Sequence, residues 1–375
     1  MARLLRRSPH YGQHVAHGAK EFLDFAGWEM PTHFSSLAEE AQACRTAAIL
    51  FDGHAMGELH IQGKDALKAA QKLCVNDIAK LAPGMMAYTS LCTEDGGIFD
   101  DLVVFCLAPD HFLLTMAAFN THKTPAWVEQ HTAGMNVCVT DQCAGTTCIE
   151  IQGPKSRQIM QKIAEFDVSD KALPYYRIAN GKIAGVDCMV ARLGVTGELG
   201  YEIFYDPGHA WRMYDAFVNA GKDEGLALCG NRTIGTFRLE KVYHVYTRDI
   251  DETINPYEAG LGWTVKLVKG DFIGRKALEK VEASGPVRKL VGFEIGDKPV
   301  VVAGKSAIQI GGKNVGHVAV VGFSPTLKKA IGLGYVTTSE AREGNELTLT
   351  ADSGTLKAKI VGIPFFDPKG TRIRV

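Results

Sequence analysis

The sequence predicts an α+β fold that ends in a separate β-rich domain, and three observations favour this. The chain has 375 residues, enough for roughly two or three domains that each bury a core. Helical and strand-like segments are mixed without the strict alternation of βαβ units. After about residue 285 the helical periodicity almost vanishes, and short apolar segments follow one another between turns.

The predicted helices lie before this change. Between residues 64 and 82, apolar side chains recur every three or four positions, which is the spacing of an amphipathic helix. The same periodicity returns at 155–166 and at 208–220. We therefore expect helices in these three segments.

Strands are predicted between the helices. The segments 102–106 and 112–116 are apolar runs joined by Ala-Pro-Asp at 108–110, a pattern typical of a β-hairpin. The segments 147–151 and 189–192 each end before a glycine-containing turn. Both are expected to be strands.

The C-terminal part predicts a small antiparallel barrel or sandwich, because short apolar segments alternate with glycine-rich turns. These segments are 290–295, 307–310, 316–321, 331–336, 347–350 and 356–361.

Charge and composition exclude some classes of partner. The 41 Lys and Arg residues oppose 42 Asp and Glu residues, so the formal net charge is −1. A nucleic-acid partner needs a basic face. We expect no such face and therefore no nucleic-acid partner.

No apolar stretch is long enough to span a bilayer, and the N-terminus has no apolar signal region. We expect a cytoplasmic protein without a membrane partner, whose nine cysteines are reduced.

No familiar metal or nucleotide motif is present. The sequence has no Walker loop, no G-x-S-x-G elbow and no H-E-x-x-H motif. His10, His14 and His17 would share one face of a helix. No carboxylate pattern accompanies them, so we expect a solvated N-terminal turn and no metal.

A pair of carboxylates is the first candidate for chemistry. Asp100 and Asp101 begin an apolar strand after the turn at 95–97. Because successive side chains of a strand point to opposite faces, one carboxylate can be solvated while the other enters a cavity. A turn followed by a charged strand end is the alternative.

A glycine-rich segment carries the second candidate. Gly194, Gly197 and Gly200 surround Glu198, and their missing side chains allow a tight backbone. A carboxylate on such a loop suits a two-pronged contact with an amidine-like edge, as in a pterin. A glycine-rich hairpin with a surface glutamate would give the same pattern.

Several short segments occur in an order that one known family shares. They are Phe-Ala-Gly-Trp-Glu-Met-Pro at 25–31, Leu-Phe-Asp at 50–52 with Met-Gly at 56–57, Asn-Asp-Ile-Ala-Lys-Leu at 76–81, Gly-Gly-Ile-Phe-Asp-Asp-Leu-Val at 96–103, Ile-Gln-Gly-Pro at 151–154, Gly-Val-Thr-Gly-Glu at 194–198, Arg-Leu-Glu at 238–240, Asp-Ile-Asp-Glu at 249–252 and Asp-Phe-Ile-Gly-Arg at 271–275. Together they resemble the aminomethyltransferase family, the T-protein of the glycine cleavage system. The resemblance covers nearly the whole chain.

The resemblance implies a three-domain cloverleaf around a central folate pocket, with an antiparallel β-barrel as the C-terminal domain. We expect the first domain to combine 1–50 with 140–225. The second, which holds the folate pocket, would combine 51–139 with 226–284. The barrel domain would span 285–375.

The resemblance also implies roles for single residues. Asp101 corresponds to the acidic residue of the chemical step, Glu198 to the glutamate that contacts the pterin, and Arg232 to an arginine near the folate. Further residues lie in segments that approach the pocket: Tyr88, Met56 and Trp263. For these three, packing in a core is an equal alternative.

Among the departures from the family pattern are two segments and, in addition, Ala117 and the stretch 246–248. Asp-Gly-His-Ala-Met stands at 52–56 where the family has Asp-Val-Ser-His-Met, so His54 is displaced by one position. Gly-Asn-Arg-Thr at 230–233 replaces Gly-Ala-Arg-Asp and introduces Asn231 and Thr233. These three residues are expected to line a pocket for the one-carbon donor if that donor differs from the family's.

Three functions follow from the resemblance. The first is transfer of an aminomethyl group from the lipoyl arm of a carrier protein to tetrahydrofolate, with release of ammonia. The second, motivated by the departures, is tetrahydrofolate-dependent demethylation of a small sulfonium, betaine or methoxy compound. The third is folate binding without turnover. No metal is expected in any of them.

Overall fold

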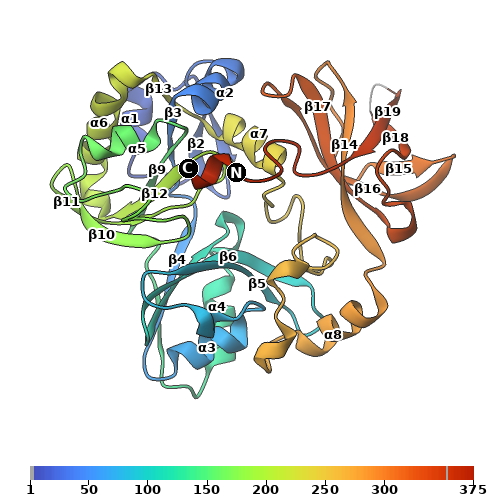
Figure 1. Cartoon of the computed structure of the whole chain (residues 1–375), viewed down its shortest axis with the longest axis horizontal. Coiled ribbons are helices and arrows are strands. Elements are labelled where there is room, and N and C mark those ends of the chain that lie inside the picture. The colour runs from blue at the N-terminus through green and yellow to red at the C-terminus, as the bar shows by residue number, and fades with distance from the viewer. Residues whose placement is uncertain (1–3, 352–353) are drawn as a thin grey trace.

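The computed structural model describes residues 4–351 and 354–375, and the chain forms three lobes around a common centre (Figure 1). Two lobes contain an open sheet with helices, and the third is a closed barrel. Helix α7 (Asn231–Lys241) lies at the centre. The predicted α+β class and the cloverleaf with a C-terminal barrel are confirmed.

The first lobe is built on a six-stranded sheet in the order β10-β11-β12-β9-β3-β13. All neighbours are antiparallel except β13 and β3. The strands are β3 (Ala48–Asp52), β9 (Thr147–Gln152), β10 (Ile178–Ile183), β11 (Val186–Ala191), β12 (Gly200–Tyr205) and β13 (Leu226–Leu228). The other elements of this lobe are α1 (Tyr11–Ala16), the ribbon of β1 (Glu21–Phe25) and β2 (Trp28–His33), α2 (Leu37–Thr46), α5 (Ser156–Gln161) and α6 (Ala210–Gly221). Helices α5 and α6 lie where the periodicity at 155–166 and 208–220 predicted them.

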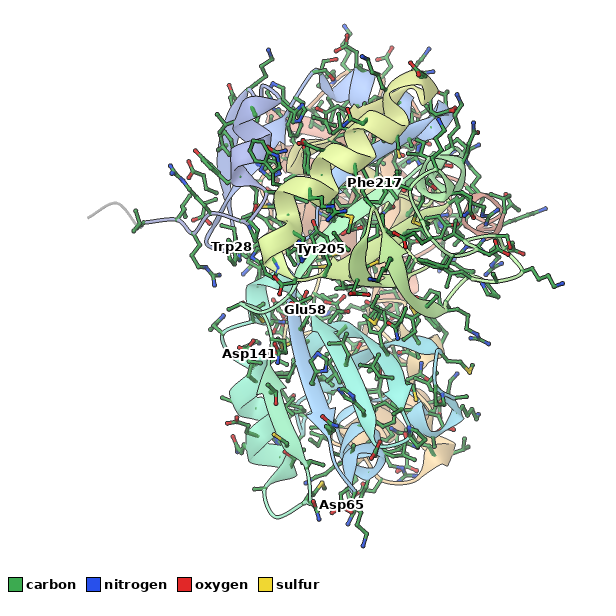
Figure 2. The ribbon with its side chains drawn as sticks, turned by 90° about the vertical axis from the view of Figure 1, so that its left-hand side faces the viewer. Trp28, Glu58, Asp65, Asp141, Tyr205 and Phe217 are labelled. Atoms are coloured by element: carbon green, nitrogen blue, oxygen red, sulfur yellow. The ribbon has the colours of Figure 1, made fainter. Side chains whose placement is uncertain are left out.

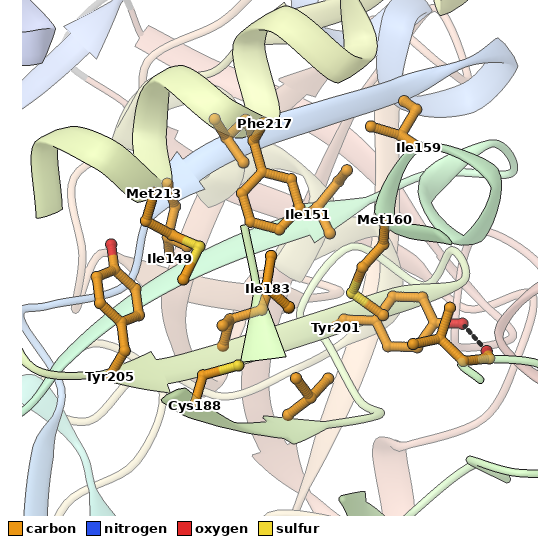
Figure 3. Packing of buried hydrophobic residues seen from close by; sticks show 14 of the residues in the cluster. Ile149, Ile151, Ile159, Met160, Ile183, Cys188, Tyr201, Tyr205, Met213 and Phe217 are labelled. Atoms are coloured by element: carbon orange, nitrogen blue, oxygen red, sulfur yellow. Dashed lines mark hydrogen bonds between the residues drawn. The ribbon is translucent and has the colours of Figure 1, made fainter. Parts of the chain in front are cut away.

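The two faces of this sheet differ because side chains alternate along each strand. On one face Ile149 and Ile151 of β9 pack against Phe217 of α6 in a fully buried core (Figure 3). The hydroxyl of Tyr201 in the same core donates to the Val168 carbonyl at 3.1 Å, so its polar group is satisfied. The residues between these core positions point to the opposite face of the sheet.

The second lobe is an antiparallel five-stranded sheet in the order β5-β6-β7-β4-β8. Its strands are β4 (Gly57–Gln62), β5 (Met86–Cys92), β6 (Ile98–Ala108), β7 (His111–Met116) and β8 (Cys138–Asp141). Its helices are α3 (Ala66–Leu73), α4 (Thr124–Thr132) and α8 (Arg275–Ser284). The predicted hairpin is the β6–β7 pair. Figure 2 shows this sheet below the first lobe, with Glu58 where the two meet.

One predicted helix is interrupted. The helix expected at 64–82 consists of α3 and, after an extended stretch, a 3₁₀ turn at Ile78–Lys80. Cys74 has φ −92° and ψ 145°, and the N–H of Val75 donates to the Ser90 carbonyl at 3.0 Å. The helix ends early because this stretch bonds to the edge of β5 instead.

The third lobe is a barrel closed in the order β14-β17-β16-β15-β18-β19. Its strands are β14 (Arg288–Gly296), β15 (Ala307–Ile310), β16 (Lys313–Ser324), β17 (Lys329–Thr337), β18 (Glu346–Ala351) and β19 (Gly354–Val361). A Cβ at Gly316 would lie 1.8 Å from the Tyr335 carbonyl oxygen. The close approach of β16 and β17 therefore requires glycine there.

The residues that follow the barrel return to the first lobe. Arg192 Nη2 donates to the Val375 carbonyl at 2.7 Å. Arg372 and Glu198 form an ion pair at 2.8 Å. The barrel is thus connected to the other lobes at both of its ends.

The cysteines are unpaired: all nine are free, and only Cys138 is exposed. This fits the expectation of reduced core thiols. Within residues 4–351 and 354–375, no helix is both long and apolar enough to cross a membrane.

Candidate active site

A large cavity lies between the three lobes. Its volume is about 1390 Å³, more than the roughly 300–1,000 Å³ of most small-molecule sites. The first lobe contributes Glu150 and Glu202 to its wall, the second lobe Tyr88 and Asp101, and the barrel Val320. The cavity has room for an elongated ligand together with a second reactant.

Asp101 lines this cavity and has a tyrosine as its partner. The Tyr88 hydroxyl donates to Oδ2 of Asp101 at 2.8 Å. Burial, followed by the charge of the neighbouring Asp100, raises the pKa of Asp101 to about 7. A carboxyl group with a pKa near neutrality can take up or give a proton under physiological conditions.

Asp100 points to the other face of β6, as strand alternation predicts, but it is buried. Its Oδ2 accepts from the Thr124 hydroxyl at 2.7 Å and its Oδ1 from the Asn120 amide at 2.8 Å. Burial raises its pKa to about 6. The expectation that one of the two carboxylates is solvated is therefore wrong, because α4 and the turn before it cover this face.

An aromatic wall stands next to Asp101. The rings of Tyr88 and Trp263 stack with their centroids 6.1 Å apart and their planes at 23°. Trp263 is 60% exposed although it lines the cavity, so a flat ligand could cover a large apolar side chain there. Met56 lines the same cavity. The structure thus brings these three predicted residues together with Asp101.

The rim of the cavity carries basic residues. Asn231 and Arg232 line it from the first turn of α7, and Arg248 lines it as well. Arg232 and Arg248 are exposed, so their charges are available to an anionic part of a ligand.

His54 and Thr233 do not line the cavity. The His54 ring packs edge-on against Trp28 with centroids 4.5 Å apart, and its backbone N–H donates to Asp52 at 2.9 Å. The Thr233 hydroxyl donates to Glu40 at 2.5 Å. Two of the three residues expected in a changed donor pocket therefore serve packing inside the first lobe.

Glu198 also lies outside the cavity lining. Its Oε1 accepts from Arg45 at 2.8 Å, and Arg372 Nε lies 2.8 Å from both carboxylate oxygens. Gly197 precedes it at φ +81°, a left-handed conformation that favours glycine. With both oxygens held by arginines, the contact between Glu198 and a pterin stays a prediction.

Sequence reasoning missed two glutamates that line the cavity, Glu150 and Glu202. They face each other directly in the antiparallel register of β9 and β12. Burial raises the pKa of Glu202 to about 8. Burial and the charge of Glu202 raise the pKa of Glu150. The signal was available, because each glutamate stands between two apolar residues of a strand that is otherwise buried.

Two of the three N-terminal histidines, His10 and His14, are buried, whereas His17 is exposed. The expectation of a solvated turn is therefore wrong for the first two. His10 Nδ1 lies 3.0 Å from Asp52 Oδ1, and its Nε2 lies 2.6 Å from the Tyr205 hydroxyl. His14 Nε2 lies 3.5 Å from the other Asp52 oxygen. His10 and His14 can be buried because Asp52 supplies an acceptor to each of them. The described part of the chain has no group of three or more His, Cys, Asp or Glu residues arranged to hold a metal ion.

Known proteins resemble this chain over nearly its full length. The family model "GCVT N-terminal domain" matches residues 10–269, and "Glycine cleavage T-protein C-terminal barrel domain" matches residues 288–367. An aminomethyltransferase of Halothermothrix orenii is 37% identical over 96% of this chain and 100% of its own. One of Symbiobacterium thermophilum is 39% identical over 96% of this chain and 97% of its own. The crystal structure of glycine cleavage system aminomethyltransferase T from Bartonella henselae has a TM-score of 0.89 and 26% identity, covering 97% of this chain and 99% of that one.

Proposed function

Because the chain belongs to the glycine cleavage T-protein family, we propose that it is an aminomethyltransferase that passes a one-carbon unit to tetrahydrofolate. The unit arrives as an aminomethyl group on the lipoyl arm of a carrier protein. The products are 5,10-methylenetetrahydrofolate, ammonia and the reduced lipoyl arm. The observation that supports this most is Asp101, hydrogen-bonded to Tyr88 in the cavity between the lobes.

The reaction asks for little covalent work by the protein. Tetrahydrofolate, when bound, supplies the nitrogen atoms that accept the one-carbon unit. The protein must hold donor and acceptor against each other, exclude water and stabilise the positive charge that develops. Asp101 is suited to the last task, because Tyr88 fixes one of its oxygens while its ionised form attracts that charge. With a pKa of about 7, the same carboxylate can also take up a proton.

The lining of the cavity fits a folate. The rings of Tyr88 and Trp263 suit the flat pterin. The exposed Arg232 and Arg248 suit the anionic tail. Met56 adds apolar surface to the same cavity.

We assign the N–H edge of the pterin to Glu202 instead of Glu198. A carboxylate makes short, charge-assisted hydrogen bonds with such an edge. Glu202 lines the cavity, whereas the oxygens of Glu198 are held by Arg45 and Arg372. Glu198 would then have a structural role, because it links Arg45 of α2 to Arg372 in the segment after the barrel.

A turnover assay tests the reaction class. The protein is incubated with an aminomethylated lipoyl carrier, with and without tetrahydrofolate, and ammonia and the folate product are measured. We expect folate-dependent ammonia and 5,10-methylenetetrahydrofolate. A functional T-protein run in parallel shows that the carrier is competent. A 5-methyl product from a sulfonium, betaine or methoxy donor, without ammonia from the carrier, would overturn the proposal in favour of demethylation.

A further inference from the structure

We propose that Glu150 and Glu202 act as one unit on the cavity wall: folate binding removes the proton of Glu202, whose carboxylate binds the pterin edge, while Glu150 keeps its own proton. The released proton goes to the solvent. This inference rests on the proposed function, because folate is the ligand that expels the proton.

The geometry of the sheet places the two acids against each other. Glu150 and Glu202 are partners in the register of β9 and β12, and residues opposite each other in antiparallel strands have Cβ atoms about 4.5–5.5 Å apart. Each residue is only 3% exposed. Two negative charges at this separation, away from water, repel each other strongly. The pair is therefore expected to carry at most one charge.

The surroundings do not compensate a second charge. Four acidic groups interact electrostatically with the pair: Asp52 of β3, Glu58 of β4, Cys148 of β9 and Tyr176 before β10. The polar partner of Glu150 is neutral, since the Gln152 amide donates to its Oε2 at 2.7 Å. A protonated Glu150 suits these surroundings better than an ionised one.

The backbone leaves space for Glu150. A Cβ at Gly53 would lie 2.8 Å from Glu150 Oε1 and 3.2 Å from the sulfur of Cys148. Because Oε2 accepts the Gln152 hydrogen bond, Oε1 is the oxygen that carries the proton. This gives a physical role to glycine at position 53, where the chain departs from the family pattern.

Titration of the pair sets the direction of proton movement. With the Glu202 pKa at about 8, this residue holds a proton at pH 7 in the free protein. Ligand N–H groups that bond to the ionised carboxylate lower that pKa and expel the proton. Glu150 then faces a new negative charge, which raises its pKa and keeps it neutral.

Calorimetry counts the proton. Wild-type protein is titrated with tetrahydrofolate in buffers of different ionisation heat, at several pH values. We expect release of about one proton per folate at pH 7, and a release that vanishes well above pH 8. Binding without proton release at pH 7 would overturn the inference and leave the proposed function intact.

Two isosteric variants assign the proton. Glu150→Gln copies the neutral acid, so affinity and proton release should stay within about threefold of wild type. Glu202→Gln should abolish proton release and weaken binding by about tenfold to a hundredfold. A loss of tenfold or more in Glu150→Gln would show that Glu150 binds as an anion and would overturn the inference. Proton release that survives in Glu202→Gln would overturn it as well.

Infrared spectroscopy examines the pair without folate. The wild-type protein at pH 7 should show a protonated-carboxyl band that the Glu202→Gln variant lacks. Absence of this difference would overturn the inference whether or not folate binds. Absence of folate binding, in contrast, would overturn the proposed function, and the band would still report the protonation of Glu202.

Discussion

Asp100 and Asp101 are adjacent in the chain, yet their surroundings call for different roles. Asp101 lines the cavity with one oxygen held by Tyr88, whereas Asp100 is fully buried among hydrogen-bond donors. We expect Asp101→Asn to lower kcat by about 10²–10⁴-fold, the scale for a positioned acid–base group, with little change in folate affinity. Steady-state kinetics and calorimetry measure both.

The matched control is Asp100→Asn. It should keep most of kcat but lose about 1–3 kcal/mol of unfolding free energy, because the donors Asn120 and Thr124 lose an acceptor. Denaturant unfolding measures this loss. A stable but inactive Asp100→Asn protein beside a fully active Asp101→Asn protein would contradict the assignment.

The pKa of Asp101 also predicts a pH dependence. If the ionised form works, kcat falls as the pH drops through about 7, because protonation removes the charge. The Tyr88 hydrogen bond favours the ionised form, so Tyr88→Phe should move the midpoint to higher pH. Rate profiles of both proteins measure the shift. A rate that instead rises on acidification would show that the protonated acid is the active form.

At the level of elements, local patterns predicted the barrel strands and the β6–β7 hairpin, but they missed helices such as α2 and α4 and did not show what each face meets. The hairpin β6–β7 follows from alternation and a turn, which are local signals. Which glutamate of the segment 198–202 reaches the cavity depends on Arg45 and Arg372, which lie far away in the chain. The residue types on β9 and β12 were visible, but their register was not.

Helix α1 illustrates the same limit. Three histidines at helical spacing read as a solvated turn, and only the fold brings Asp52 and Tyr205 to His10. A carboxylate more than thirty residues away in the chain supplies the buried partner of His10 and His14. The residues next to His10 and His14 in the sequence therefore could not predict that these two side chains are buried.

The contact between α1 and Asp52 predicts an acid-sensitive part of the stability. Asp52→Asn leaves one acceptor oxygen where two serve the Ser8 hydroxyl at 2.5 Å and the His54 N–H at 2.9 Å, and should cost roughly 1–3 kcal/mol at pH 7. The pKa of Asp52 is lowered by His10, and burial lowers that of His14 to about 4. The unfolded chain thus binds these protons more readily, so their stability contribution is full above about pH 6.5 and is lost as the pH falls.

Denaturant unfolding of the wild type between pH 7 and pH 2 measures this effect: stability should fall first below about pH 6.5, as the unfolded chain protonates His14, and again below about pH 4, as it protonates Asp52. Asp215→Asn is the control, since this carboxylate accepts from Gln13 of the same helix at 2.5 Å but is half-exposed. The Asp215→Asn variant should lose less than about 1 kcal/mol of unfolding free energy. Equal losses in the two variants would remove the special role of Asp52.

At the level of the whole molecule, Arg45 connects separate parts of the chain. This residue of α2 pairs with Glu198 at 2.8 Å and with Glu240 of α7, and its guanidinium lies 4.0 Å from the centre of the Phe366 ring. Arg45→Met would leave the buried Glu240 without its arginine and Glu198 with Arg372 alone, which costs about 3–5 kcal/mol. Scanning calorimetry should show a lower Tm.

The surface pair of Arg275 and Glu279 provides the comparison. Its atoms are 3.5 Å apart within one exposed helix turn, and Arg275→Met should cost no more than about 0.5 kcal/mol. Similar Tm values for the two variants would show that Arg45 contributes no more than an ordinary surface charge.

The return of the chain from the barrel to the first lobe has a mechanical consequence. A domain attached to its neighbours at one point can rotate about that hinge, whereas a domain attached at both ends cannot. Arg372 and Arg192 hold the segment that follows the barrel against the first lobe. We therefore expect no hinge motion that opens and closes the barrel over the cavity. The reactants would then enter a cavity whose dimensions stay nearly constant. Small-angle scattering should give the same radius of gyration with and without tetrahydrofolate.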